Sequence, residues 1–323
     1  MGKYIIRRIL LMIPVILGVT VLIFTFLYFS PGDPAQMLLG DQATPEEVDA
    51  LREEMGLNDH YFVQLGRYIW KACHGNFGES YINGRPVSDE LLKKFPTTVI
   101  LATLGTVVSV LFAVPLGVLS ATHQNRLLDN IARLVSLAFV SMPIFWEGLM
   151  MILIFAVNLK WLPASGFYGP VYWILPVITV GLQASGTILR STRSSMLETI
   201  RQDYIRTARA KGAAEGSVIW RHALGNAMIS ILTVIGLRFS TSLGGSVVSE
   251  TIFSIPGLGR YIVDGIRQRD YPIVQGGVLL ICIACSVINL IIDILYAYVD
   301  PRIKSQYARK KQSKNVRNNA EKR

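Results

Sequence analysis

Charged residues are scarce in this chain of 323 residues: Asp, Glu, Lys and Arg make up 17% of it, whereas hydrophobic residues make up 51%. Soluble domains usually carry about 25% charged residues. The hydrophobic residues also gather in blocks of about 20, the length that an α-helix needs to cross the hydrocarbon layer of a membrane. The composition therefore excludes an ordinary soluble domain and predicts an all-α polytopic membrane protein surrounded by lipid.

The common signatures of catalysis and metal binding are also missing. The sequence has no Gly-x4-Gly-Lys-Ser/Thr phosphate loop, no His-Glu-x-x-His pair and no nucleophile elbow. Its three cysteines form no disulfide framework, and the adjacent Cys73 and His74 are too few ligands for a metal site. The net charge of +10 comes without a nucleic-acid-binding motif. We therefore expect no catalytic residue, no metal, no cofactor in this chain and no nucleic-acid partner.

Six hydrophobic segments predict six transmembrane helices. They cover residues 9–29, 97–120, 131–157, 174–189, 227–249 and 274–298. The first follows three basic residues and lacks the small-residue cleavage site of a signal peptide, so it is expected to stay uncleaved. If the N-terminus is inside, 21 of the 32 Lys and Arg residues lie on the inner side. This bias predicts that both termini are cytoplasmic.

The segments between the helices divide the chain. Residues 1–30 hold the N-terminus and first helix, 31–96 an external helical cap, 97–303 a five-helix domain, and 304–323 a polar, basic tail with the composition of a disordered segment. In the cap, Thr44-Pro45 predicts a helix start and Gly56 its end, and a second helix is expected at 61–72. The cap is too small to be an independent enzyme domain.

The largest internal loop, residues 190–226, contains a predicted short helix. Asp203 is a candidate N-cap and Gly212 a candidate C-cap. The small side chains of Ala208 and Ala210 would let this helix sit closely in a groove of another protein. Arg206, Thr207, Arg209 and Lys211 complete the segment and supply polar contacts. A basic internal loop that follows only from the charge bias across membranes is the alternative.

The loop at residues 251–273 is expected to break and then resume a helix at the outer side. Pro256, Gly257 and Gly259 interrupt the helix, and an amphipathic turn begins at Tyr261. Broken segments at membrane depth are tolerated where protein or water covers them, and they often mark transport pathways. A gate that lines the outer mouth is the preferred interpretation, and a simple surface connection is the alternative.

Two charged residues of opposite sign lie deep inside predicted spans, Glu147 and Arg238. A charge at mid-bilayer costs about 2.5–3.5 kcal/mol on insertion scales, so each side chain should face protein or water. We expect both to face the interior, where they either pair with each other or line a solute path. A structural pair with no contact to solute is an equal alternative.

Residues 203–212, which read Asp-Tyr-Ile-Arg-Thr-Ala-Arg-Ala-Lys-Gly, resemble the cytoplasmic loop of ABC importer permeases, in particular the dipeptide/oligopeptide/nickel permease family. Ala208, Gly212 and Leu224 match the general loop pattern, whereas its Glu, first Ala, Ile and Pro are absent. The resemblance extends along almost the whole chain and is closest to the dipeptide branch. Further matching pieces are Ser-Met-Pro-Ile-Phe-Trp at 141–146, Trp-Leu-Pro-Ala-Ser-Gly at 161–166, Pro-Gly-Leu-Gly-Arg at 256–260 and Arg-Asp-Tyr-Pro at 269–272. Glu147 and Arg238 depart from the family pattern, which has an apolar residue and Gln there.

The resemblance implies a non-catalytic permease subunit of the bacterial cytoplasmic (inner) membrane. Its expected partners are a second, similar permease subunit, two cytoplasmic ATPase subunits that bind ATP and Mg²⁺, and an external solute-binding protein. The short helix at 203–212 would dock in an ATPase subunit and pass on its motion, giving alternating access. The expected solutes are di- and oligopeptides, with nickel chelates, glutathione or another small chelator as the alternative. A self-sufficient channel or secondary transporter is a rival, but no clear internal repeat supports it.

Overall fold

A computed structural model of the protein describes residues 2–40 and 42–299. Within them the chain is mostly helical, and its single β-bridge joins Glu79 and Pro86. Five helices are long and apolar enough to cross a membrane, or six segments if one bent pair counts as a span. The long helices are α1 (Gly2–Tyr28), α5 (Val87–Thr122), α8 (Ile174–Ile200), α11 (Leu224–Ile252) and α13 (Tyr271–Val299). The predicted all-α membrane architecture is therefore confirmed. The tail predicted at 304–323 lies outside the described residues.

The third predicted span is not one straight helix, and this corrects the expected continuous segment 131–157. Helix α6 (Leu127–Ser141) and the following pair α7 (Ile144–Met151) and π-helix Ile152–Asn158 meet at 105°. Pro143 causes the break because it has no N–H to donate and because it disfavours helical backbone in the residue before it. Met142 accordingly has an extended backbone, with φ −76° and ψ 129°.

Shorter helices complete the chain. The cap contains α2 (Pro34–Leu39), α3 (Pro45–Glu54) and α4 (Tyr61–Cys73), so both predicted cap helices are present. Thr44 and Glu47 form a reciprocal capping box at the start of α3. The remaining elements are the 3-10 helix Pro170–Trp173, α9 (Asp203–Ala210), α10 (Glu215–Ser217), the π-helix Val218–Ala223 and α12 (Leu258–Arg267).

Two helix ends differ from the sequence-based boundaries by ten residues or more. Helix α5 begins at Val87, ten residues before the expected 97, and passes through Pro96 and Pro115. Neighbouring helices can satisfy the backbone groups that a proline frees in a membrane helix. Helix α8 continues from the expected end at 189 to Ile200. The cap is therefore shorter than 31–96, and the internal loop is shorter than 190–226.

Helices α5 and α8 form the central contact of the bundle. A Cβ atom added at Gly105 would lie 2.7 Å from Val180 Cγ1, and one added at Gly117 would lie 2.6 Å from Thr192 Cβ. Small residues at these positions let two membrane helices approach closely. Around this contact a buried core joins α5, α8, α9 and α11, with Leu189, Met196 and Ile231 fully covered.

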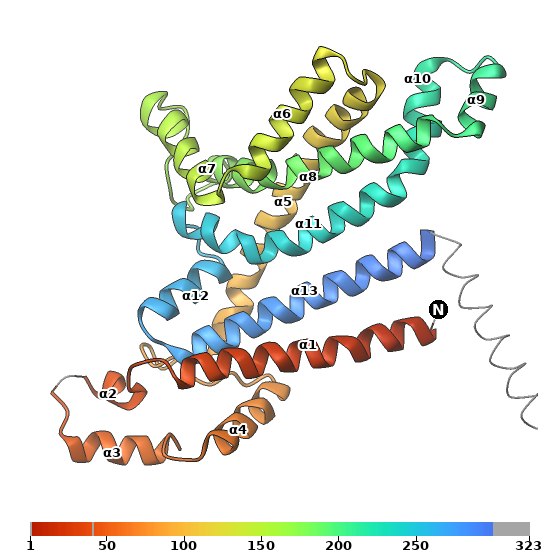
Figure 1. Ribbon diagram of the computed structural model, residues 1–323. Coiled ribbons are helices and arrows are strands. Elements are labelled where there is room, and N and C mark those ends of the chain that lie inside the picture. The colour runs from red at the N-terminus through yellow and green to blue at the C-terminus, as the bar shows by residue number, and fades with distance from the viewer. Residues whose placement is uncertain (1, 41, 300–323) are drawn as a thin grey trace, which may run out of the picture.

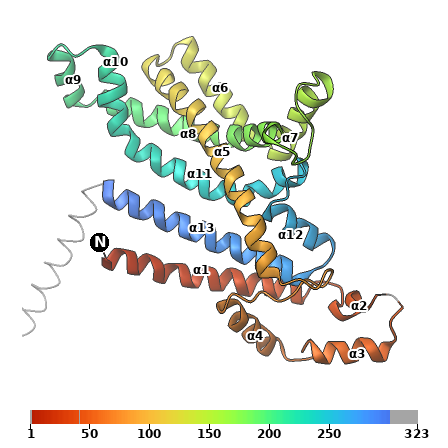
Figure 2. The same cartoon turned by 180° about the vertical axis from the view of Figure 1, so that it is seen from behind.

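The candidate coupling and gate segments lie at the two ends of the bundle (Figures 1 and 2). The start of α1, the end of α13, and helices α9 and α10 lie at one end, on the right in Figure 1; we call this the α9 end. Helix α12 and the cap helices α2 and α3 lie at the opposite end, which we call the α12 end. The segments that the sequence analysis assigned to coupling and gating are thus on opposite sides of the molecule.

Candidate coupling helix, gate segment and membrane pocket

Helix α9 has one fully buried side chain, at a position that the sequence did not mark as functional. Ile205 is fully buried and packs in the same core as Met196 and Val218. It is the first apolar side chain after the end of α8 apart from Tyr204, which is 46% exposed. Its position as a lone large aliphatic residue in a polar loop is the sequence feature that could have predicted its burial. Because Ile205 is held by the core that contains α8, displacement of α9 should move α8 with it.

The remaining face of α9 points away from the core. Asp203, Arg206, Thr207, Arg209, Ala210, Lys211 and Gly212 are exposed. Ala208 is half-buried against the core, so only Ala210 of the two predicted small residues is presented outward. The N-cap is Gln202 and makes no side-chain cap bond, which corrects the assignment of Asp203 as the cap. Gly212 follows the helix with φ +81°, as its predicted role at the helix end requires.

An exposed ion pair closes the turn between α9 and α10. Arg209 donates from Nε and Nη2 to the two carboxylate oxygens of Glu215, at 3.0 and 2.6 Å. These bonds raise the pKa of Arg209 above its ordinary value. Bidentate pairing fixes the relative orientation of two groups better than a single contact does. The pair therefore shapes this segment, although exposed pairs add little stability.

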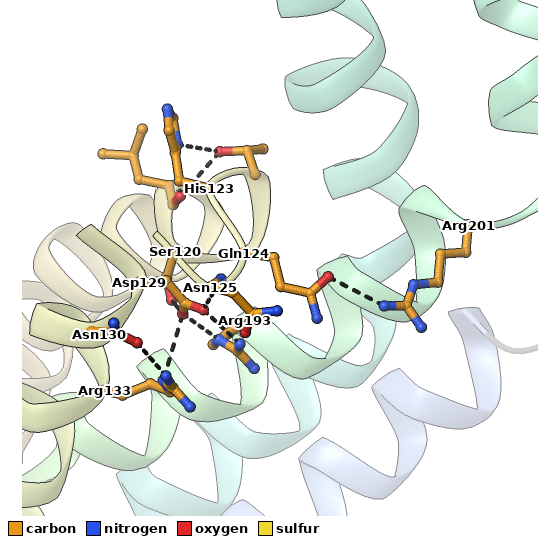
Figure 3. Close-up of polar contacts among 11 residues, drawn as sticks. Ser120, His123, Gln124, Asn125, Asp129, Asn130, Arg133, Arg193 and Arg201 are labelled. Atoms are coloured by element: carbon orange, nitrogen blue, oxygen red, sulfur yellow. Dashed lines mark hydrogen bonds and ion pairs between the residues drawn. The ribbon is translucent and has the colours of Figure 1, made fainter. Parts of the chain in front are cut away.

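A buried ion pair lies at the same end and joins three helices (Figure 3). Asp129, in the first turn of α6, is fully buried and accepts bonds from Arg193 Nε at 2.6 Å and Arg193 Nη2 at 2.8 Å. Ser120 Oγ of α5 donates to it at 2.6 Å, and the backbone N–H of Asn125 at 2.8 Å. The turn between α5 and α6 is thereby fixed to α8, the helix that leads directly into α9. Sequence reasoning missed this cluster because Asp129 and Arg193 are 64 positions apart.

At the α12 end a second buried carboxylate holds the candidate gate. Glu250, near the end of α11, is fully buried and accepts bonds from Thr98 Oγ1 at 2.7 Å, Ser246 Oγ at 3.2 Å and the backbone N–H of Arg260 at 3.0 Å. Thr98 Oγ1 also accepts the N–H of Leu258 at 2.8 Å. The carboxylate thus lies at the N-terminus of α12, where the helix dipole favours negative charge.

Close packing against α11 leaves no room for a side chain at either glycine predicted to break the gate segment. A Cβ added at Gly257 would lie 2.3 Å from Glu250 Cδ, and one added at Gly259 would lie 2.5 Å from Val247 Cα. Pro256 is exposed in the turn before α12. Tyr261 is half-buried, with Lys94 Nζ 4.9 Å from its ring centre, and burial raises its pKa to about 12. The four predicted gate residues therefore lie on one short segment packed against α5 and α11.

The far end of the gate segment is joined to the cap. Asp270, between α12 and α13, is fully buried and accepts a bond from Ser80 Oγ at 2.5 Å and a weaker one from the N–H of Ile82 at 3.4 Å. The segment from Phe253 to Asp270 is therefore fixed at both ends, by Glu250 on the bundle side and by Ser80 on the cap side.

The two intramembrane charges do not pair with each other in the described residues. Arg238 donates from Nη2 to Thr187 Oγ1 at 2.7 Å and lines a cavity of about 280 Å³ between α6, α8 and α11. Glu147, in α7, is 4% exposed, and neither of its carboxylate oxygens has a hydrogen-bond partner in the described residues. The structure therefore gives no support to a direct pair between Glu147 and Arg238. A role for either residue in the solute path stays a hypothesis.

Comparison with known proteins agrees with this geometry. The model of a family described as "Binding-protein-dependent transport system inner membrane component" matches residues 113–305, and the model of its N-terminal part matches residues 1–102. The fold is similar to that of the membrane subunit in two inward-facing structures of a methionine ABC transporter, with TM-scores of 0.55 and 0.57. Both share 18% sequence identity and cover 65% of this chain and 96% of theirs.

Two curated relatives are much closer in sequence. The dipeptide transport system permease protein of Alkalihalophilus pseudofirmus is 41% identical, over 94% of this chain and 100% of the relative. The glutathione transport system permease protein of Escherichia coli strain K12 is 39% identical, over 94% of this chain and 99% of the relative. Such permeases are non-catalytic and work with ATPase subunits. The chain belongs to the binding-protein-dependent transport family and is a multi-pass inner-membrane permease subunit of an ABC importer in the peptide and glutathione group.

Proposed function

We propose that this chain imports di- and oligopeptides by alternating access, together with a second similar permease subunit, two cytoplasmic ATPase subunits and an external solute-binding protein. ATP and Mg²⁺ would be bound by the ATPase subunits. The observation that carries the proposal is α9, a short exposed helix that is joined to α8 through Ile205 and the surrounding core. In this arrangement the α9 end faces the cytoplasm, as the distribution of basic residues predicts.

The proposed mechanism follows from where the fixed contacts lie. Closure of the ATPase subunits would displace the 203–217 segment, and α8 would pass the displacement into the bundle through the Asp129–Arg193 pair. The gate segment at the opposite end is held to α11 and α5 by Glu250 and Thr98, so a shift of these helices moves the gate with them. ATP hydrolysis would then reset the bundle.

The solute class is supported by the relatives. One relative is named as a dipeptide permease and another as a glutathione permease. Glutathione is itself a modified tripeptide. Glutathione is therefore the second candidate, and a nickel chelate has no such relative among those described above. Uptake into proteoliposomes by the assembled importer, with ATP inside and the loaded binding protein outside, tests the proposal. ATP-dependent accumulation of labelled dipeptide is expected. Accumulation of glutathione alone would select the second candidate, and uptake without ATPase subunits would contradict an ABC importer.

Replacing Ala210 by Trp is expected to reduce ATP-driven uptake by about tenfold or more, because a bulky side chain on the exposed face of α9 would prevent close docking. The measurement is initial uptake rate at equal amounts of permease in the membrane. Ala50→Trp provides the matched control, since Ala50 is an exposed alanine of cap helix α3. Equal uptake by the Ala210 variant and the native chain would exclude α9 as the docking element.

A further inference from the structure

Arg238 lies inside the helix bundle and has no charged partner among the residues that the structure describes. Arg238 is the central residue of α11, and Thr187, which accepts its hydrogen bond, is the central residue of α8. Both helices are long and apolar enough to cross a membrane, so the middle of each helix is expected near mid-membrane. No acidic residue lines the cavity or forms an ion pair with Arg238 in the part of the chain that the structure describes. An isolated charge at this depth costs about 2.5–3.5 kcal/mol, which marks it as a functional group.

The surroundings of Arg238 leave most of its hydrogen-bonding capacity unused. A guanidinium carries five N–H donors, and within the described residues only the bond to Thr187 engages one of them. The hydroxyls of Thr241 and Ser242 donate to the Arg238 carbonyl oxygen, at 2.9 and 2.8 Å, and so shape the wall of the cavity. Gln183 also lines it and contributes an amide with no side-chain bond in the described residues. The cavity thus presents a positive charge and N–H donors that have no protein partner among the described residues.

The Arg238 guanidinium and the size of the cavity indicate which chemical group the cavity would bind. The planar guanidinium fork matches the two oxygens of a carboxylate, and such bidentate contacts are among the strongest hydrogen bonds in proteins. A volume of about 280 Å³ is at the lower limit of small-molecule sites, so it suits the carboxylate end of a peptide and not a whole oligopeptide. Transporters commonly hold their solutes near the bilayer midplane.

We propose that the cavity around Arg238 binds a carboxylate of the transported peptide during its passage through the membrane. The inference rests on the proposed function and names the chemical group recognised within it. It also gives a role to the arginine at a position where the resembling family has an uncharged residue. A carboxylate of the second permease subunit could instead pair with the Arg238 guanidinium. The experiment below distinguishes this pairing from binding of the peptide.

The test compares two solutes on several variants of the assembled importer in proteoliposomes. One solute is a labelled dipeptide with a free C-terminal carboxylate, and the other is the same dipeptide as its C-terminal amide, each delivered by saturating binding protein. Any preference of the binding protein is the same for all variants and cancels when the carboxylate-to-amide ratio of uptake rates is compared between them. The variants are Arg238→Gln and Arg238→Lys, and Arg67→Gln in cap helix α4 is the matched control.

Arg238→Gln is expected to lower the carboxylate-to-amide ratio by about tenfold, since only the free carboxylate loses a charged partner. Arg238→Lys should retain part of the ratio, and Arg67→Gln should leave it unchanged. An unchanged ratio for Arg238→Gln overturns the inference. Equal loss for both solutes also overturns it and indicates that Arg238 is structural or pairs with the second subunit. Failure of the native importer to take up either dipeptide would instead contradict the proposed function.

Discussion

Replacing Asp129 by Asn is expected to lower the free energy of unfolding by about 3 kcal/mol or more, because it leaves the Arg193 guanidinium without its charged partner in a buried site. The same change should reduce ATP-driven uptake more than the amount of folded protein, since Asp129 fixes the turn between α5 and α6 to the helix that leads into α9. Thermal unfolding of the purified importer and uptake rates normalised to folded permease measure the two effects.

The exposed pair Arg209–Glu215 is a matched control with similar geometry. Its shortest contact is also 2.6 Å, but its side chains are 40% and 61% exposed, against 19% for Arg193 and 0% for Asp129. Glu215→Gln should therefore change the free energy of unfolding by less than about 1 kcal/mol. Joint replacement of Asp129 by Asn and Arg193 by Met should cost less than Asp129→Asn alone, because no buried charge remains. A larger cost for the double variant would mean that the ion pair is not the source of the effect.

Replacing Glu250 by Ala is expected to reduce coupled uptake by more than about tenfold through release of the gate segment. The change removes three hydrogen bonds and leaves the Thr98 hydroxyl and the Arg260 N–H short of a partner, at a cost of about 1–3 kcal/mol for each unsatisfied buried group. It also opens space beside Gly257 and Gly259, where the carboxylate now lies. Uptake rate and passive leak of preloaded dipeptide are the measurements.

Asp264 offers the control for this prediction, because it is an acidic residue of α12 whose contact with Arg260 is long, at 3.7 Å, and partly exposed. Asp264→Ala should leave both uptake and leak near their native values. If Glu250→Ala and Asp264→Ala behave alike, the gate segment is not held by the buried carboxylate.

Hydropathy located the membrane helices because apolar length is a local property of the sequence. Helix breaks and helix ends were harder to predict from the sequence, since they depend on the helices packed around them. Pro143 lies inside a predominantly apolar segment long enough for one span, so hydropathy alone could not show the 105° bend. The expected span began at residue 97, directly after Pro96, whereas α5 begins at Val87 and runs through this proline.

The candidate sites divide in the same way. The positions of Gly257 and Gly259 in a broken segment could be predicted from the sequence. The reason for them, the close approach of Glu250 to Gly257 and of Val247 to Gly259, required the structure. The Asp129–Arg193 pair joins residues far apart in the chain, and no local sequence pattern predicts it. Glu147 and Arg238 were recognised as unusual by their depth, whereas their separation into different surroundings depended on how α7, α8 and α11 pack.

The sidedness of α9 is the most direct test of the whole account. Lys211, exposed at the end of α9, is replaced by Cys in a Cys73→Ser background, and a membrane-impermeant maleimide is applied to right-side-out and inverted vesicles. The native chain supplies the opposite control, because its Cys73 is exposed on the cap. We predict that Lys211→Cys reacts only in inverted vesicles and Cys73 only in right-side-out vesicles. Reaction of Lys211→Cys in intact right-side-out vesicles would place the coupling helix outside the cell and contradict the importer mechanism.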